Sequence, residues 1–376
     1  MKRDNPLRVF SYKVEFITFD SQVKSRVLKS YNRWFFMGLR FTFVTMLRDY
    51  IEITRLFNMG LTAVAPVLGA LSMWDVGSFS LWKLFVLFLI GSLAHIYGFV
   101  INDVIDFRLD KLSKDLSARP LVRGSITRKQ VVFFAIACMI GSFLLSFVFF
   151  SDPLRYLVLA CILLIAYFLA TMYDIASKKY PGMDLVLAGA IFFLILFGAS
   201  TIGTPTRLAY VVALIGGIQV LFMNMINGAI KDIDHDEEGS ANTVAIRLGA
   251  KVHAGIIALP LSFKTTGYLI EIVRIVLIFL PFVFLGLSPS LWQIALLMVL
   301  AVATFFSIYK LYSIKIFDRS RIRKLIGIIV IFMYATTPIM LSSLNIYIIL
   351  VALIPPVWFF ASNLVLHKTI FEPKTM

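Results

Sequence analysis

The sequence predicts an all-α polytopic membrane protein, and three observations support this prediction. Of its 376 residues, 60% are apolar, 35 are Phe and only 15% are charged, whereas soluble domains are about 45–50% apolar and about 25% charged. The apolar residues form blocks of roughly 18 to 22 residues, the length at which a helix crosses the hydrocarbon core of a bilayer. The basic residues, in turn, are concentrated in every second loop between these blocks.

Ten apolar blocks are predicted to be transmembrane helices. They cover residues 57–74, 82–105, 131–150, 154–172, 184–202, 208–230, 270–287, 291–312, 324–342 and 346–366. The seventh block contains Glu271 and Arg274 near its start, and this pair either neutralises itself within the helix or lies at the membrane interface. Cys138 and Cys161 lie inside apolar blocks without a disulfide or metal-binding spacing, so we interpret them as packing residues.

The positions of the 36 Lys and Arg residues predict the orientation. When residues at block ends are counted with the adjacent loop, eleven precede the first block and the loops after the even-numbered blocks hold 7, 2, 4, 6 and 2, whereas the opposite loops hold only Lys83, Arg155 and Arg207. Because Lys and Arg concentrate on the cytoplasmic side of membrane proteins, we expect both termini in the cytoplasm. This bias accounts for the net charge of +15, and no separate basic module remains that would predict nucleic acid as a partner.

The first fifty residues differ from the rest of the chain. They mix basic and aromatic residues and lack the apolar core and small-residue cleavage site of a signal peptide. We expect residues 1–50 to form a cytoplasmic amphipathic extension on the membrane surface. One transmembrane domain is expected to follow over residues 51–368.

The first candidate catalytic motif lies where the second block ends. Asn102, Asp106 and Asp110 recur there every four residues, and on a continuing helix this spacing places them on one face, about one turn apart. Mg²⁺ prefers a few carboxylates together with substrate phosphate oxygens and water. The motif is therefore a candidate Mg²⁺ site, although acidic residues are also common at an ordinary solvated helix end. His95 falls on nearly the same face, where a hydrogen-bonded packing role is commoner than ligand binding.

A second acidic motif follows the sixth block, where Asp232 and Asp236 repeat the four-residue spacing. Four crossings separate the two motifs, so both face the same compartment. Two cations bound there would attract a diphosphate and would take up the negative charge that grows on it as an allylic diphosphate ionises. Basic residues predicted on the same side are candidates for contacts to this diphosphate: Arg119, Arg123, Lys178, Lys179, Lys231 and Arg247.

These motifs resemble the UbiA superfamily of intramembrane prenyltransferases, over roughly residues 50 to 366. The family's first motif, N-D-x-x-D-x-x-x-D, is matched by Asn102, Asp103, Asp106 and Asp110, and its second, D-x-x-x-D, by Asp232 and Asp236. Weaker matches are Arg55 with Asn58 at the first block and Tyr173 with Lys178 after the fourth. In the Thr-x-Pro-x-x-x-Gly pattern that usually follows the second motif, Thr243 and Gly249 are present but Ala245 replaces Pro.

The resemblance implies a ring-like bundle of nine or ten transmembrane helices around a central cavity, with both Asp motifs on the cytoplasmic side of a prokaryotic cell membrane. It implies Mg²⁺ as cofactor and transfer of a prenyl group from a polyprenyl diphosphate, such as geranylgeranyl diphosphate, to a hydrophobic acceptor that is a lipid or an aromatic quinone precursor. The implied catalytic residues are Asp106, Asp110, Asp232 and Asp236, which with Asn102 are also the implied metal ligands. The implied substrate-binding residues are Arg55, Asn58, Asp103, Arg119, Tyr173, Lys178 and Lys231. Tyr97 and Tyr173 are further candidates, because their rings could shield a carbocation.

Three alternative functions differ in how well they fit. Phosphoribosyl transfer to a polyprenyl phosphate occurs within the same superfamily and stays open. A secondary transporter is disfavoured because the Asp residues cluster at the ends of the blocks rather than at the membrane midplane. A CDP-alcohol phosphotransferase is disfavoured because Asp103 and Asp106 are followed by Val104 and Phe107 rather than by Gly.

Overall fold

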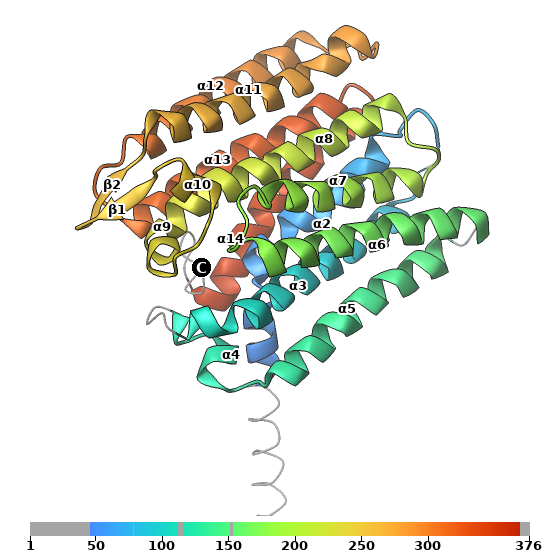
Figure 1. The fold of residues 1–376 in the computed structure, drawn as a ribbon. Helices are drawn as coiled ribbons and strands as arrows, with labels where there is room; N and C mark the ends of the chain where they lie inside the picture. The colour runs from blue at the N-terminus through green and yellow to red at the C-terminus, as the bar shows by residue number, and fades with distance from the viewer. Residues whose placement is uncertain (1–45, 78, 112–115, 151–152, 369–376) are drawn as a thin grey trace, which may run out of the picture. The chain divides into compact units, whose positions relative to one another are not determined.

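The computed structural model describes residues 46–77, 79–111, 116–150 and 153–368 (Figure 1). The chain divides into two units, Met1–Arg48 and Asp49–Met376, and the second of these is described below. The predicted N-terminal extension lies almost entirely outside the described residues, and its amphipathic character stays a prediction.

The described residues are mainly helical, and the helices follow the predicted blocks. In chain order they are α2 (Leu56–Leu71), α3 (Leu81–Asp110), α4 (Pro120–Arg123), α5 (Arg128–Phe149), α6 (Pro153–Ala176), α7 (Asp184–Ser200), α8 (Arg207–Phe222), the π-helix η2 (Met223–Gly228), α9 (Ala229–Glu238), α10 (Val244–Arg247), α11 (Leu261–Phe284), α12 (Leu291–Tyr312), α13 (Arg319–Leu341), the 3₁₀ segment η3 (Ile346–Leu353) and α14 (Ile354–His367). Two short antiparallel strands, β1 (Lys251–His253) and β2 (Ile256–Ala258), form a hairpin before α11.

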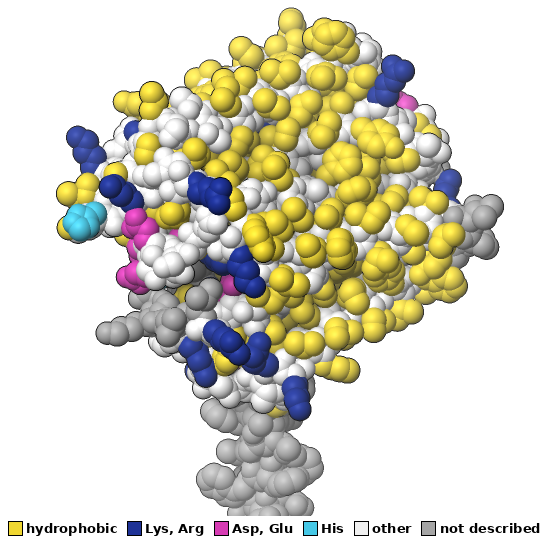
Figure 2. Space-filling view, viewed as in Figure 1, with side chains coloured by type: hydrophobic (Ala, Val, Ile, Leu, Met, Phe, Trp, Pro, Cys, Tyr) yellow, Lys and Arg dark blue, Asp and Glu magenta, His cyan; other side chains and the backbone are white. Residues whose placement is uncertain are grey.

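The structure confirms an all-α membrane fold. Within the described residues, eight helices are long and apolar enough to cross a bilayer, and the bent pair Met46–Ile53 and Leu56–Leu71 gives a ninth. The remaining predicted block corresponds to α7, an apolar helix of 17 residues. Figure 2 shows hydrophobic side chains over a broad area of the viewed face, while charged side chains gather mainly at the end where α4, α9 and the strands lie.

The helices that matter for function pack side by side around one interior space. α2 contacts α3, α7 and α14, and α7 contacts α6 and α8, while α11 and α12 lie at one edge of the bundle and α5 at the other (Figure 1). Two glycines permit the close approach of α2 and α7. A Cβ added to Gly69 would lie 1.8 Å from the Ile195 carbonyl oxygen, and one added to Gly198 would lie 1.8 Å from the Pro66 carbonyl oxygen. Small residues at such contacts let membrane helices pack backbone against backbone.

The seventh predicted helix differs from its prediction in one respect. α11 begins at Leu261, nine residues before the predicted start at 270, so Glu271 and Arg274 lie within the helix rather than near its end. Both side chains are fully buried and form a two-pronged ion pair, with Arg274 Nε and Nη2 donating to the Glu271 carboxylate at 2.8 and 2.7 Å. The pair therefore neutralises itself inside the bundle, and Arg274 Nη1 also donates to Thr336 of α13 at 2.8 Å.

Candidate active site

Both acidic motifs line a single cavity with a volume of about 780 Å³. The predicted metal-binding and substrate-binding residues that line it are Arg55, Asn58, Asn102, Asp106, Asp110, Arg119, Tyr173, Lys178, Lys231, Asp232 and Asp236. Asp103 is the exception, because it is buried behind the cavity wall. Segments separated by more than 100 residues thus converge on one site, as the count of membrane crossings predicts.

The first motif extends as one helix to its last carboxylate. Because α3 is helical through Asp110, Asn102, Asp106 and Asp110 follow one another along one face. Asn102 Nδ2 donates to Asp174 Oδ1 at 3.3 Å, and Asp110 Oδ2 accepts from Arg119 Nη1 at 2.5 Å. Asp106 lines the cavity and makes neither a hydrogen bond nor a salt bridge within the described residues.

A backbone bend places Arg55 beside this motif. Arg55 has φ 46° and ψ 49°, the left-handed conformation, and it separates α2 from the preceding helical turn. Its Nη2 donates to Asp103 Oδ1 at 2.5 Å, and Arg119 Nη1 lies 3.4 Å from the same oxygen. The guanidinium also lies over the Phe99 ring, 5.0 Å from its centroid. Asp103, which the resemblance implied as a substrate-binding residue, is therefore buried behind the cavity wall and holds two arginines in position.

His95 supports the same bend from the neighbouring helix. Its Nε2 lies 3.2 Å from the Thr54 carbonyl oxygen and 3.4 Å from that of Arg55, and its Nδ1 lies 3.2 Å from Thr62 Oγ1. The Arg55 carbonyl oxygen also accepts from the Asn58 backbone amide at 3.0 Å, so the imidazole adds a side-chain partner for the two carbonyl groups at the bend. His95 also lines the cavity, but both of its ring nitrogens are in hydrogen-bonding contact with residues 54, 55 and 62 of the cavity wall.

The second motif lies at the end of a long helix that contains a π-helical segment. α8, η2 and α9 run continuously from Arg207 to Glu238, and η2 immediately precedes the motif; π-helical turns are frequent at functional sites. Lys178 Nζ donates to Asp236 Oδ1 at 2.6 Å, while Lys231 Nζ lies 3.4 Å from Asp232 Oδ2. Asp236 is buried, whereas the Asp232 side chain is 41% exposed and faces the cavity.

Asp110 and Lys178, which lie outside the membrane-spanning segments, carry shifted pKa values. Burial raises the pKa of Asp110, and the attraction of Arg119 offsets only part of this. Burial lowers the pKa of Lys178, but the negative charges of Asp236, Asp232 and Asp106 outweigh it and the net shift is upward. Lys178, which lines the cavity, therefore stays an ammonium group.

Apolar and aromatic side chains line much of the rest of the cavity. They include Phe57, Leu61, Phe99, Leu163, Tyr167, Leu187, Ile191, Leu194, Val220, Met223 and Tyr334. Tyr97, a candidate for shielding the carbocation, does not line the cavity: it is buried behind the wall, bonded to Thr171 Oγ1 at 2.8 Å and packed edge-on against Tyr167. Tyr173 does line the cavity.

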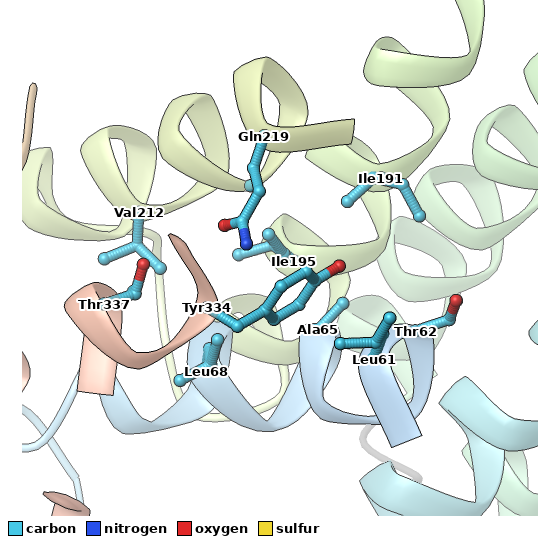
Figure 3. Close-up of a pocket in the computed structure, with 11 residues that line it drawn as sticks. Leu61, Thr62, Ala65, Leu68, Ile191, Ile195, Val212, Gln219, Tyr334 and Thr337 are labelled. Atoms are coloured by element: carbon cyan, nitrogen blue, oxygen red, sulfur yellow. The ribbon is translucent and has the colours of Figure 1, made fainter. Parts of the chain in front are cut away.

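A smaller pocket of about 20 Å³ lies next to this apolar region (Figure 3). It shares four lining residues with the large cavity, namely Leu61, Thr62, Ile191 and Tyr334. Tyr334 from α13 and Gln219 from α8 both point into it. Tyr334 therefore lies between the large cavity and the small pocket.

Some basic candidates lie away from the cavity, and others were not anticipated. Arg123 bonds instead to Asp49 and to the Ala118 carbonyl oxygen, and neither Lys179 nor Arg247 lines the cavity. Arg319 and Arg323, at the start of α13, do line it. Arg319 is held by Asp234, whose two carboxylate oxygens each lie 2.7 Å from Arg319 Nη2. Their i,i+4 spacing at the start of an apolar block was a usable signal.

The donor set fits a divalent cation shared with a substrate. Carboxylates from both motifs and the Asn102 amide of the first motif line the cavity. Asp106 has no hydrogen-bond or salt-bridge partner within the described residues that would compete with a cation. In the part of the chain that the structure describes, no three His, Cys, Asp or Glu side chains are arranged to hold a metal ion by themselves.

Comparison with known proteins identifies the family. The model of the UbiA prenyltransferase family matches residues 63–334, which include both acidic motifs. The chain belongs to the UbiA prenyltransferase family. The predicted family is thereby confirmed, and the chain is a membrane prenyltransferase.

Curated relatives of this UbiA prenyltransferase include archaeal and bacterial enzymes. A digeranylgeranylglyceryl phosphate synthase of Korarchaeum cryptofilum is 29% identical over 237 residues, which is 62% of this chain and 76% of that protein. A 4-hydroxybenzoate octaprenyltransferase of Saccharophagus degradans is 34% identical over 112 residues, which is 30% of this chain and 35% of that protein.

Solved structures share the fold. A digeranylgeranylglyceryl phosphate synthase structure aligns with a TM-score of 0.56 at 17% identity and covers 81% of this UbiA prenyltransferase and 98% of that chain. A UbiA homolog from Archaeoglobus fulgidus bound to DMAPP and Mg²⁺ aligns with a TM-score of 0.54 at 17% identity, covering 77% of this chain and 99% of that chain.

Proposed function

We propose that this UbiA prenyltransferase uses Mg²⁺ to transfer a polyprenyl group, of the geranylgeranyl class, from its diphosphate to a glycerol-phosphate lipid. The single observation that carries the proposal is the division of the cavity into two parts. One part is lined by both acidic motifs with Arg55, Arg119, Lys178 and Lys231, and the other by apolar and aromatic side chains. A prenyl diphosphate has the same division into a highly charged head and an apolar tail.

The residues at the charged end have complementary roles. Asn102, Asp106 and Asp110 of the first motif and Asp232 and Asp236 of the second would hold Mg²⁺. Bound there, Mg²⁺ would neutralise charge on the diphosphate and make it a better leaving group. Within the protein, Asp103, Asp110 and Asp236 bond to Arg55, Arg119 and Lys178. Cationic groups held in this way cost little reorganisation when negative charge grows on the leaving group.

The apolar part of the cavity would bind the prenyl tail and protect the reacting carbon. Phe99, Tyr167, Tyr173 and Tyr334 line it, and the faces of such rings attract a developing carbocation. Excluding water there favours attack by the acceptor over hydrolysis. The position of the cavity beside the basic loops favours a cytoplasmic site, because Lys and Arg concentrate on that side of the membrane.

The acceptor is the part of the proposal that depends most on the relatives. The glycerol-phosphate lipid is favoured because the match to the digeranylgeranylglyceryl phosphate synthase of K. cryptofilum extends over 62% of this chain. The second candidate is an aromatic quinone precursor, favoured by the shorter match to the S. degradans enzyme. Transfer of phosphoribose to a polyprenyl phosphate is the third and would give a product with no new prenyl group.

Product analysis tests this proposal. Purified protein is supplied with geranylgeranyl diphosphate, Mg²⁺ and, in separate reactions, geranylgeranylglyceryl phosphate, 4-hydroxybenzoate or no acceptor, and the products are identified by mass spectrometry. The expected product is the glycerol-phosphate lipid with a second geranylgeranyl group. A prenylated benzoate instead would change the acceptor, and no prenylated product with any allylic diphosphate would refute the proposed function.

A further inference from the structure

One buried carboxylate of the cavity belongs to neither acidic motif. Asp174 lies near the end of α6, next to Tyr173, and lines the cavity. Only 6% of the surface of Asp174 is exposed to solvent. Oδ1 accepts from Asn102 Nδ2 at 3.3 Å, whereas Oδ2 is buried and has no hydrogen-bond partner within the described residues.

The charge of Asp174 is not balanced in the way that the other buried carboxylates are. Asp103 and Asp110 form salt bridges with arginines, and Asp236 forms one with Lys178. Asp174 forms no salt bridge with any described residue. Asp106 and Asp103 are among the charged groups that act on it, together with Arg55. A buried carboxylate with an unpaired oxygen is unfavourable unless a cation or a hydrogen-bond donor completes it.

The hydrogen bond to Asn102 also fixes the direction of the amide. Because Nδ2 donates to Asp174, the Asn102 carbonyl oxygen is the atom left to bind a cation, and carbonyl oxygens are ligands for Mg²⁺ and related hard cations. Carboxylates that bond to a metal ligand commonly orient it in this way, and their loss costs about 10- to 100-fold in metal affinity.

We propose that Asp174 completes the first cation site, orienting Asn102 through Oδ1 and supplying Oδ2 as a carboxylate ligand beside Asp106. This proposal rests on the cation dependence in the proposed function. The alternative is a purely structural hydrogen bond between α3 and α6. That alternative predicts lower stability on removal of the charge, with no change in cation affinity.

Mn²⁺ binding to the full-length protein separates these possibilities. Free Mn²⁺ is measured by electron paramagnetic resonance, with and without inorganic diphosphate, and thermal unfolding is recorded for each variant. Asp184→Asn is the matched control, because Asp184 is an acidic residue at the start of the adjacent α7 that does not line the cavity. Asp174→Asn is expected to weaken Mn²⁺ binding by about 10- to 100-fold, and Asp184→Asn to leave it unchanged. Equal Mn²⁺ affinity in Asp174→Asn and wild type would overturn the inference.

Two further variants keep the outcome interpretable. Asp106→Asn removes a ligand of the proposed function itself, so loss of Mn²⁺ binding in Asp106→Asn but not in Asp174→Asn contradicts only the role of Asp174. Absence of Mn²⁺ binding in the wild type under both conditions contradicts the role of Asp174 and the proposed cation dependence together. If Asp174→Asn does not fold, Asp174→Glu carries the test: displacement of the carboxylate is expected to weaken Mn²⁺ binding, and wild-type affinity would refute the proposal.

Discussion

The buried ion pair in α11 gives a stability prediction that can be worked out from the structure. Glu271 and Arg274 are both fully buried, joined by hydrogen bonds of 2.8 and 2.7 Å, and Arg274 is tied to Thr336 of α13 at 2.8 Å. Glu271→Leu leaves a guanidinium that cannot lose its charge inside the bundle. Removing one partner of a buried pair costs about 3–5 kcal/mol, which corresponds to a folding equilibrium changed by about 10²- to 10⁴-fold.

The companion variants have an expected order. Arg274→Leu leaves a carboxylate that can be protonated, so its cost is smaller than that of Glu271→Leu. The double variant Glu271→Leu/Arg274→Leu has no buried charge, and replacement of a whole buried pair by apolar residues is often close to neutral. Thermal unfolding in a mild detergent should therefore rank the double variant near wild type and Glu271→Leu lowest. A double variant as unstable as Glu271→Leu would refute the reasoning.

Three further predictions concern packing, the tail pocket and the charged end of the cavity. Gly198→Ala places a Cβ against a backbone carbonyl of α2 and should cost about 1–3 kcal/mol of stability, whereas Gly327→Ala, with open space around the new Cβ, should not lower the unfolding temperature. Tyr334→Ala should join the small pocket to the cavity and lengthen the space for the prenyl tail. The ratio of kcat/KM for geranylgeranyl diphosphate to kcat/KM for geranyl diphosphate should therefore rise. An unchanged ratio would exclude Tyr334 as a limit on chain length. Lys178→Met removes a cation from the diphosphate end and should lower kcat/KM by about 10²-fold, whereas Lys179→Met, which is outside the cavity, should retain wild-type activity.

Membrane helices were predictable because bilayer thickness imposes a length on them. The apolar blocks can be recognised in the sequence by their length and composition, and each block coincides with a helical segment of the structure. Boundaries were less predictable where helices continue beyond the apolar region. α11 starts among Ser262, Lys264, Thr265 and Thr266, polar residues that do not extend an apolar block but are compatible with a helix outside the hydrocarbon core.

The acidic motifs were predictable because each is periodic within one helix. Asp106 and Asp232 each belong to a motif with a four-residue spacing that is visible in the sequence. The even number of membrane crossings between them predicts that both lie on the same side of the membrane. Asp174, Arg319 and Arg323 line the same cavity but have no spacing relation to either motif. Their position depends on which helices become neighbours, and that depends on packing contacts such as the one between α2 and α7.

Aromatic residues show the same limit at the level of single side chains. Tyr97 and Phe99 are two positions apart on α3, yet Phe99 lines the cavity while Tyr97 packs behind it against Tyr167. Both residue types suit either environment. The rotation of α3 about its own axis decides which of the two side chains faces the cavity. Amino-acid composition does not predict that rotation.

The central claim is that the two acidic motifs act together on a prenyl diphosphate through divalent cations. The most direct test measures the diphosphate released from geranylgeranyl diphosphate, in the presence of acceptor, by wild type, Asp106→Ala and Asp232→Ala, each with Mg²⁺ or with EDTA. We predict Mg²⁺-dependent release by wild type, and no release above background by either variant although both remain folded. Release by wild type in EDTA, or full activity in either folded variant, would contradict this account.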